Sequence, residues 1–170
     1  MDVEVFDNFL PKEDFDQLQN MIVFNAEFPL YFQKSLTYNN DDSCDHDHWN
    51  WYQSHIIYQN DIIESNNYFN YLYSLFNQRL LELKSLMRIK VNFYPYTETF
   101  REHKPHQDYL FSSRAAIFSL NTCNGFTRIG RDVKIESVSN RMLFFDGNTT
   151  HNSTTTTDAA ARYNINFNYL

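Results

Sequence analysis

The sequence has few of the residues and runs that define several common protein classes. It contains two cysteines, Cys44 and Cys123, which are far apart and too few for a disulfide framework, so we expect a reducing compartment. No stretch approaches the roughly 18 consecutive apolar residues of a transmembrane helix. The acidic N-terminus is not followed by the apolar run of a signal peptide. These absences predict a cytoplasmic protein without a membrane partner.

Positive charge is also scarce, whereas hydrophobic residues are not. Lys and Arg number 14 against 21 Asp and Glu, which gives a net charge of −7. An acidic surface repels phosphate backbones, so nucleic acid is disfavoured as the main partner, although a local basic groove could override the global balance. With 170 residues, of which 42% are hydrophobic, the chain can bury one compact core. We therefore expect a single domain over residues 1–170.

Hydrophobic periodicity divides this domain into a mainly helical half and a β half. Residues 1–86 predict a short strand at 3–6, a helix from Pro11 to near Asn25, an irregular aromatic segment at 29–59 and a helix within 61–84. After Leu86 the period changes to two, and strands are expected near 89–94, 115–120, 142–145 and 163–169. Helices followed by many short strands favour a β-sandwich or barrel backed by helices. The polar run at 154–157 predicts a loop.

Two histidines and one aspartate carry the most specific chemical signal. His106 and Asp108 form a His-x-Asp motif, and residues i and i+2 of a strand point to the same face, so both could reach one metal ion. His151 follows a few strands downstream, after the apolar segment 142–145 and a turn. Two histidines and one carboxylate on one face leave coordination positions open, which is the ligand set of non-haem Fe(II) oxygenases.

Arg162 adds support from the beginning of the last predicted strand. Strand parity places it on one face with Asn164, Asn166 and Asn168, opposite the apolar residues between them. A polar face on a strand otherwise rich in aromatics indicates a lined cavity or solvent. An arginine in such a cavity suits bidentate pairing with a carboxylate, and the distal carboxylate of 2-oxoglutarate is a natural partner.

Asn92 and Tyr94 add polar groups from the strand that precedes the His-x-Asp motif. By the same parity they share a face. Their amide and hydroxyl groups could hydrogen-bond the metal-chelating end of the co-substrate.

Together these residues resemble the 2-oxoglutarate/Fe(II)-dependent dioxygenase superfamily, and most closely its prolyl 4-hydroxylase-like branch. The matching residues occur in the family's order and spacing over residues 88–170, about half of the chain. They are Tyr94-Pro95, His106-Gln107-Asp108, Asn124-Gly125-Phe126-Thr127, Asn140-Arg141-Met142-Leu143-Phe144-Phe145, His151 and Arg162-Tyr163. The pair Asn92-x-Tyr94 with His106-Gln107-Asp108 also occurs in the nucleic-acid dealkylase branch.

The resemblance implies a mostly β fold, a double-stranded β-helix (jelly-roll) with helices packed on its larger sheet. Residues 1–86 would then supply helical support and a lid, and residues 87–170 the jelly-roll core with the metal site. The implied roles are iron binding by His106, Asp108 and His151, binding of the distal carboxylate of 2-oxoglutarate by Arg162, and contact with the co-substrate by Tyr94. Ser119 stands near where the family often has a second tyrosine, and Gly125 alone replaces the usual paired glycines.

The activity that the resemblance implies is the hydroxylation of a C–H bond. Fe(II), 2-oxoglutarate and dioxygen would be required, with ascorbate as a candidate reductant, and the co-substrate would leave as succinate and carbon dioxide. A peptidyl proline in a peptide or protein is the leading substrate, and a small molecule is the other candidate. Three alternatives stay open: a nucleobase demethylase or hydroxylase, a non-catalytic jelly-roll that serves as a binding or structural module, and a cupin-like metal enzyme that does not use 2-oxoglutarate.

Other polar groups carry weaker signals. Asp45-His46-Asp47-His48 resembles a metal site, but a solvated loop, or a lid with Trp49 and Trp51, is the favoured interpretation. His103 and Lys104 are expected in a loop at the mouth of the site. Arg114 and Arg128 are expected on the surface.

Overall fold

The structure is a computed structural model, and it describes residues 3–34 and 49–170. The segment Asp45–His48 lies outside the described residues. The elements are, in chain order, β1 (Glu4–Phe6), α1 (Lys12–Ile22), β2 (Tyr31–Gln33), β3 (Tyr52–Gln59), β4 (Ile62–Ile63), α2 (Asn66–Phe76), β5 (Leu86–Pro95), β6 (Arg114–Ser119), β7 (Phe126–Ile129), β8 (Val133–Glu136), β9 (Arg141–Asp146), β10 (His151–Asn152) and β11 (Ala161–Tyr169).

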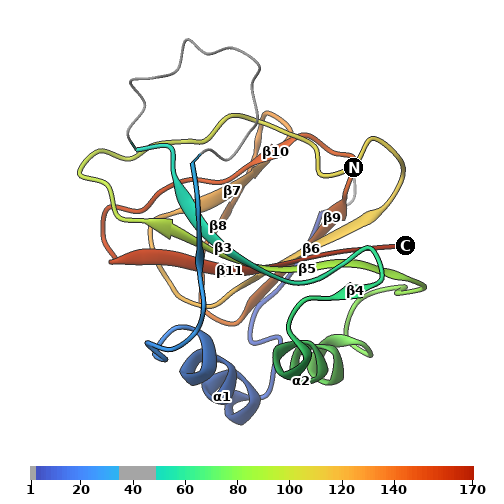
Figure 1. Ribbon diagram of the computed structural model, residues 1–170. Coiled ribbons are helices and arrows are strands. Elements are labelled where there is room, and N and C mark those ends of the chain that lie inside the picture. Colours follow the sequence, from blue (N-terminus) through green and yellow to red (C-terminus); the bar gives the residue numbers. More distant parts are fainter. Residues whose placement is uncertain (1–2, 35–48) are drawn as a thin grey trace.

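The strands form two antiparallel sheets that enclose the candidate site. The larger, eight-stranded sheet has the order β1-β9-β6-β11-β5-β3-β2, with β4 paired to β3, and the smaller one has the order β10-β7-β8. Figure 1 shows the smaller sheet on one side of the larger sheet and both helices on the other side. This is the jelly-roll expected from the resemblance.

The outer face of the larger sheet packs against the two helices in the main hydrophobic core. Leu18 of α1 and Leu72 and Phe76 of α2 are buried against Phe118 of β6 and Phe167 of β11. The Phe76 and Phe167 rings lie 4.8 Å apart. Because each such side chain stabilises the fold by about 1.5–3 kcal/mol when it leaves water, this layer holds the helices to the sheet.

The four strands predicted after Leu86 correspond to β5, β6, β9 and β11, whereas β7, β8 and β10 were not predicted. In the first half α1 ends at Ile22 and not near Asn25, and two further segments differ from the prediction. The segment predicted as irregular at 29–59 contains β2 and β3, and β3 is a full member of the larger sheet. Its register against β5 shifts between Ile56 and Tyr58, so strict alternation of apolar residues is lost there and the period-two pattern is masked. The second helix covers only 66–76, because Ile62 and Ile63 pair with β3 before it begins.

The Thr154–Thr157 run is irregular, as predicted, but it is largely buried despite its polar composition. Thr154 and Thr156 form isolated bridges with Glu102 and Tyr96, and Thr154 to Thr156 are fully buried. The segment therefore packs inside the molecule instead of lying in solvent.

No helix within the described ranges is long and apolar enough to cross a membrane.

Candidate metal centre and co-substrate cavity

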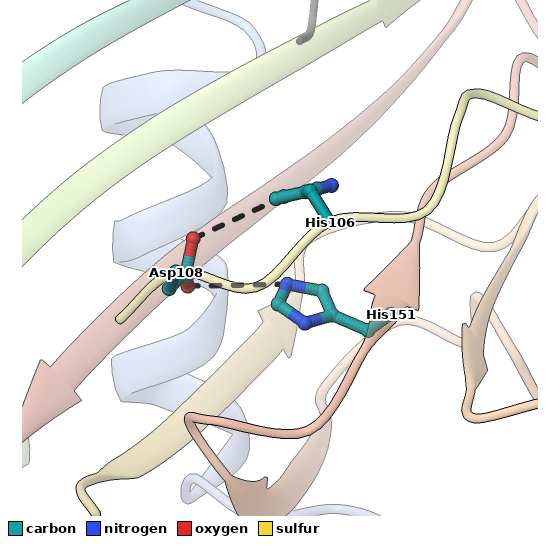
Figure 2. Close-up of side chains that lie close together, drawn as sticks. All are labelled: His106, Asp108 and His151. Carbon is teal, nitrogen blue, oxygen red and sulfur yellow. Dashed lines mark ion pairs between the residues drawn. The ribbon is translucent and has the colours of Figure 1, made fainter. Parts of the chain in front are cut away.

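The structure brings His106, Asp108 and His151 together at one end of the space between the sheets. One ligand atom from each residue lies within 4.8 Å of the others. The Asp108 carboxylate lies between the two imidazoles, with Oδ1 3.9 Å from Nε2 of His106 and Oδ2 3.9 Å from Nε2 of His151 (Figure 2). Two imidazoles and one carboxylate form one compact donor set.

Strand parity was the wrong reason for expecting His106 and Asp108 to converge. Residues 106–108 are not a strand; His106 forms an isolated antiparallel bridge with His151, and Asp108 follows in a bend. Both backbone hydrogen bonds of that bridge are made, at 2.9 Å from His106 N to His151 O and 2.8 Å in the reverse direction. The bridge sets the two histidines side by side, and the bend carries the carboxylate between them.

Both histidines direct Nε2 toward the Asp108 carboxylate. Nδ1 of His151 donates to the carbonyl oxygen of Thr149 at 2.9 Å, a contact that selects the tautomer whose Nε2 is free to bind a metal ion. Burial, and then the neighbouring His151, lower the pKa of His106 to about 4, so this imidazole is uncharged at neutral pH. An unprotonated imidazole is the form that binds a metal ion.

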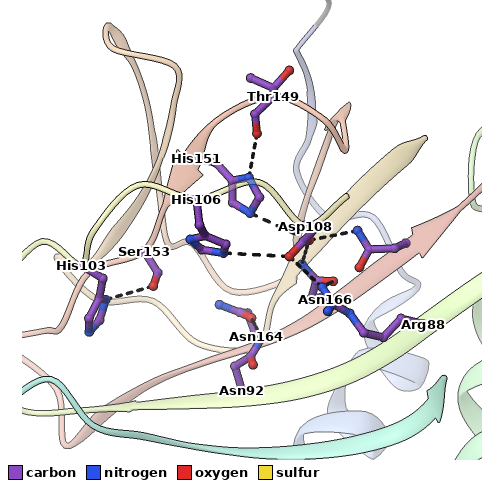
Figure 3. A network of polar contacts seen from close by, with 11 residues as sticks. Arg88, Asn92, His103, His106, Asp108, Thr149, His151, Ser153, Asn164 and Asn166 are labelled. Atoms are coloured by element: carbon purple, nitrogen blue, oxygen red, sulfur yellow. Dashed lines mark hydrogen bonds and ion pairs between the residues drawn. The ribbon is translucent and has the colours of Figure 1, made fainter. Parts of the chain in front are cut away.

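The Asp108 carboxylate is ionised and firmly oriented. Burial alone would raise its pKa, but Arg88, His151 and the amide of Asn168 outweigh burial and hold that pKa well below its usual range. Arg88 Nη2 lies 2.8 Å from Oδ1, and Asn166 donates to Oδ2 at 3.4 Å (Figure 3). Asn168 donates to the same oxygen at 3.0 Å. These contacts fix the carboxylate in the direction of the two histidines.

Arg162 lies on the same inner face of the sheet, at the other end of β11. Its side chain is buried, with Nη1 donating to the carbonyl oxygen of Phe126 at 2.9 Å and Nη2 donating to Oγ1 of Thr127 at 2.7 Å. The guanidinium carbon lies 5.6 Å from the centre of the Tyr94 ring. Among residues 3–34 and 49–170, no carboxylate lies within 4.0 Å of this guanidinium, so its charge is buried without an anionic partner.

Gly125 is required for that placement of Arg162. A Cβ atom at Gly125 would lie 2.8 Å from Cδ of Arg162, which is closer than packed carbon atoms approach. The missing side chain at Gly125 therefore makes room for the arginine.

The wall between the metal site and Arg162 comes from β5 and β11. Register places Tyr94 opposite Arg162 and Asn92 opposite Asn164, and Nδ2 of Asn92 donates to Oδ1 of Asn164 at 3.0 Å. The cavity is lined by Tyr52, Lys90, Asn92, Tyr94, His106, Asp108, Ile117, Thr127, His151, Asn152, Ser153, Asn164 and Asn166. Asn92 and Tyr94 thus face the cavity that the sequence predicted for them.

Ser119 and Thr127 differ in their relation to Arg162. Ser119 is buried on β6 opposite Asn164, whereas the hydroxyl that binds the guanidinium belongs to Thr127 on β7. Sequence reasoning assigned no role to Thr127, although it follows Gly125-Phe126 in a segment that resembles the family. Only the packing of the smaller sheet over β11 shows its contact.

Arg88 and Lys90 were also missed as members of the site. They share the parity of Asn92 and Tyr94, so the signal was present, but charged residues on a strand ordinarily face solvent. His103, which was expected in a loop at the mouth, is buried, with Nδ1 3.0 Å from Ser153 Oγ and its ring 5.4 Å from that of Tyr94.

The two arginines expected on the surface make ion pairs outside the cavity. Arg128 Nη2 lies 2.8 Å from Glu102, and Arg114 lies 3.5 Å from Glu4.

Comparison with known proteins gives matches of structure only. No protein-family model and no curated protein sequence matches the chain. A prolyl hydroxylase from Trichoplax adhaerens, solved in complex with a peptide fragment of the hypoxia inducible factor oxygen degradation domain, superposes with a TM-score of 0.64 at 16% identity over 99% of this chain and 83% of that one. A prolyl-4-hydroxylase from Pseudomonas putida gives 0.62 at 15% identity over 98% and 91%.

A structure with a different named reaction has the same fold. The non-heme alpha ketoglutarate dependent epimerase SnoN from nogalamycin biosynthesis gives a TM-score of 0.66 at 12% identity over 99% of this chain and 77% of that one. The chain therefore has the fold of the 2-oxoglutarate/Fe(II) oxygenases, and prolyl hydroxylases are among the structures that it resembles.

Proposed function

We propose that the protein is a 2-oxoglutarate- and Fe(II)-dependent dioxygenase that hydroxylates a C–H bond, with a peptidyl proline as the leading substrate. The observation that carries the proposal is the placement of two complementary groups on the inner side of the larger sheet. A triad of two imidazoles and one ionised carboxylate lines the cavity, and the buried cation of Arg162, which has no anionic partner among the described residues, is hydrogen-bonded to Thr127 in the cavity wall.

The triad fits Fe(II). Nε2 of His106, Nε2 of His151 and the carboxylate of Asp108 would hold the ion, since two histidines and one carboxylate leave positions open for other ligands. When bound, Fe(II) supplies the activation of dioxygen, coupled to the oxidation of 2-oxoglutarate to succinate and carbon dioxide. Arg88, Asn166 and Asn168 keep the carboxylate ionised and aimed at the ion.

Arg162 fits the distal carboxylate of 2-oxoglutarate. An unpaired buried cation costs several kcal/mol, and a carboxylate that enters the cavity would remove that cost. Phe126 and Thr127 occupy one side of the guanidinium, which orients it, while Nε is buried and has no hydrogen-bond partner in residues 3–34 and 49–170. Tyr94 and Asn92 line the wall along which the co-substrate would lie.

Anaerobic titration with Fe(II) and 2-oxoglutarate tests the proposal through the weak visible charge-transfer band of the complex. We expect the band in the wild type and its loss in His151→Ala, which loses an iron ligand. In Arg162→Met iron should still bind, while the affinity for 2-oxoglutarate falls by about 2–5 kcal/mol, roughly 30-fold or more, because one partner of a buried ion pair is removed.

Arg128→Met is the matched control, since Arg128 forms its ion pair with Glu102 at the surface. It should titrate as the wild type does. Absence of the band in the wild type would contradict the proposal. An unchanged affinity for 2-oxoglutarate in Arg162→Met would instead favour a metal enzyme that does not use this co-substrate.

The substrate is the finer part of the proposal. The hydroxylase from Trichoplax adhaerens was solved with a peptide, which supports an extended peptide as the molecule that reaches this cavity. Incubation of the reconstituted protein with proline-containing peptides should give products heavier by one oxygen atom. An unmodified mass with consumption of 2-oxoglutarate would indicate a different reaction, such as the epimerisation named for SnoN.

A further inference from the structure

Two cations other than Arg162 lie at the metal end of the cavity. Arg88 contacts Asp108 at 2.8 Å, and Lys90, two residues further along β5, lines the cavity together with His106 and Asp108. The ammonium group of Lys90 lies 5.7 Å from the centre of the Tyr52 ring. In the part of the chain that the structure describes, no carboxylate lies within 4.0 Å of Lys90.

The position of Lys90 puts its charge close to the candidate metal ligands. Register pairs Lys90 with Asn166, and Asn166 donates to Asp108. The charge of Lys90 is one of the causes that lower the pKa of His106. The charge of Asp108 in turn acts to raise the pKa of Lys90. Burial, and then Arg88, lower the pKa of Lys90 to about 8, which leaves it mostly protonated at neutral pH.

The loaded site would contain more positive than negative charge. If the proposed function holds, Fe(II), Arg88, Lys90 and Arg162 together bring five positive charges, against three negative charges from Asp108 and the dianion of 2-oxoglutarate. An excess of two positive charges then lies between the sheets. Because charges in such a place are poorly screened, the excess favours the entry of an anion. This local excess is opposite in sign to the chain as a whole, which carries a net charge of −7.

We propose that Lys90 receives an anionic group of the substrate, a carboxylate or a phosphate, next to the carbon that reacts. The inference rests on the proposed function and adds the chemical class of its substrate. The face of Tyr52 holds the ammonium group without neutralising it, as a cation–π contact does. His106 is the most open of the three candidate ligands, with 28% of its side chain exposed against 5% for His151, and it lines the same cavity as Lys90. We expect a substrate to enter this cavity on the open side of His106.

The test uses three pairs of capped compounds, and in each pair one member carries an anionic group that the other lacks. N-acetylproline is compared with its amide, acetyl-Glu-Pro-amide with acetyl-Gln-Pro-amide, and acetyl-phosphoserine-Pro-amide with acetyl-Ser-Pro-amide. The first two pairs represent a carboxylate at the chain end or on a side chain, and the third represents a phosphate. Dissociation constants are measured by calorimetry on the full chain, without oxygen, in the complex with Fe(II) and 2-oxoglutarate.

We expect the charged member of at least one pair to bind about 10-fold or more tightly than its neutral member, as a charge-assisted hydrogen bond provides. This ratio should fall to about one in Lys90→Met and persist in Lys90→Arg. Lys134→Met is the matched control, because Lys134 also lies over an aromatic ring, that of Phe126 at 4.4 Å, but on exposed β8. It should keep the wild-type ratio.

Two results would overturn the inference and leave the proposed function intact. In one, the protein binds Fe(II) and 2-oxoglutarate but binds the charged and the neutral member of every pair equally, or binds neither. The other is a Lys90→Met variant that keeps the ratio but binds 2-oxoglutarate 10-fold more weakly, which would make Lys90 a co-substrate contact. Failure of the wild type to bind Fe(II) and 2-oxoglutarate would overturn both proposals.

Discussion

The two faces of β11 are buried to the same degree and are opposite in chemistry. Toward the helices, Ile165 and Phe167 are fully buried in the main core. Toward the cavity, Arg162, Asn164 and Asn168 are 1%, 2% and 0% exposed. Burial of the first set stabilises the fold by itself, whereas burial of the second set costs free energy unless each polar group finds a partner.

The partners on the cavity face are only partly supplied by the chain. Asn168 donates to Asp108, and Asn92 donates to Asn164. Within the described residues, Nε of Arg162 and the side-chain oxygens of Asn92 and Asn168 are buried without a hydrogen-bond partner. Buried polar groups in native proteins usually have partners, so these three groups fit the proposed binding of ligands on this face. One face therefore holds the fold together, and the other carries the proposed site.

Phe167→Ala tests the apolar face and should have the largest effect on stability. Removal of this ring from the core should lower the free energy of unfolding by about 3–5 kcal/mol, measured by chemical denaturation. Iron affinity of the folded protein should not change, because the side chain points away from the cavity. Phe24→Ala, at a ring that is 70% exposed, is the control and should change stability by less than about 0.5 kcal/mol. A comparable loss of iron affinity in Phe167→Ala would break the distinction between the faces.

His103 gives the cavity side a pH dependence that the apolar face cannot have. Burial is the main cause that lowers its pKa to about 4, from an ordinary value of 6.5 in the unfolded chain. Between these values the unfolded chain binds a proton that the folded chain does not, so stability falls as the pH drops from 6.5 to 4, by up to about 3 kcal/mol. Denaturation of the metal-free protein at several pH values should show this loss, and His103→Gln should lack that part of it. Parallel profiles for the two proteins would refute the assignment.

Asn168→Leu tests the polar face directly and should have the smallest of these effects in free energy. The change keeps the branched shape of the side chain but removes the donor to Oδ2 of Asp108, so the affinity for Fe(II) should fall about 10- to 100-fold. Asn166→Leu should lower it less, because Asn166 lies 3.4 Å from the same oxygen against 3.0 Å for Asn168. Equal affinities in the wild type and both variants would show that the carboxylate does not need these amides.

Local patterns were sufficient for the last strand and for the composition of the site. Alternation over 163–169 predicted both faces of β11, because a strand with one apolar and one polar side repeats every two residues. The same rule failed for β3, where a register shift interrupts the alternation, and for residues 106–108, which are not a strand.

By itself, the sequence determined which residue types are available for a metal and a carboxylate, His106, Asp108, His151 and Arg162, and that strands follow Leu86. Only the tertiary structure decided how they meet. A bridge between distant segments sets His106 beside His151, and packing of the smaller sheet brings Thr127 to Arg162. The enclosure between the sheets also turns Arg88 and Lys90 inward. Such contacts join residues far apart in the chain, and no local period can encode them.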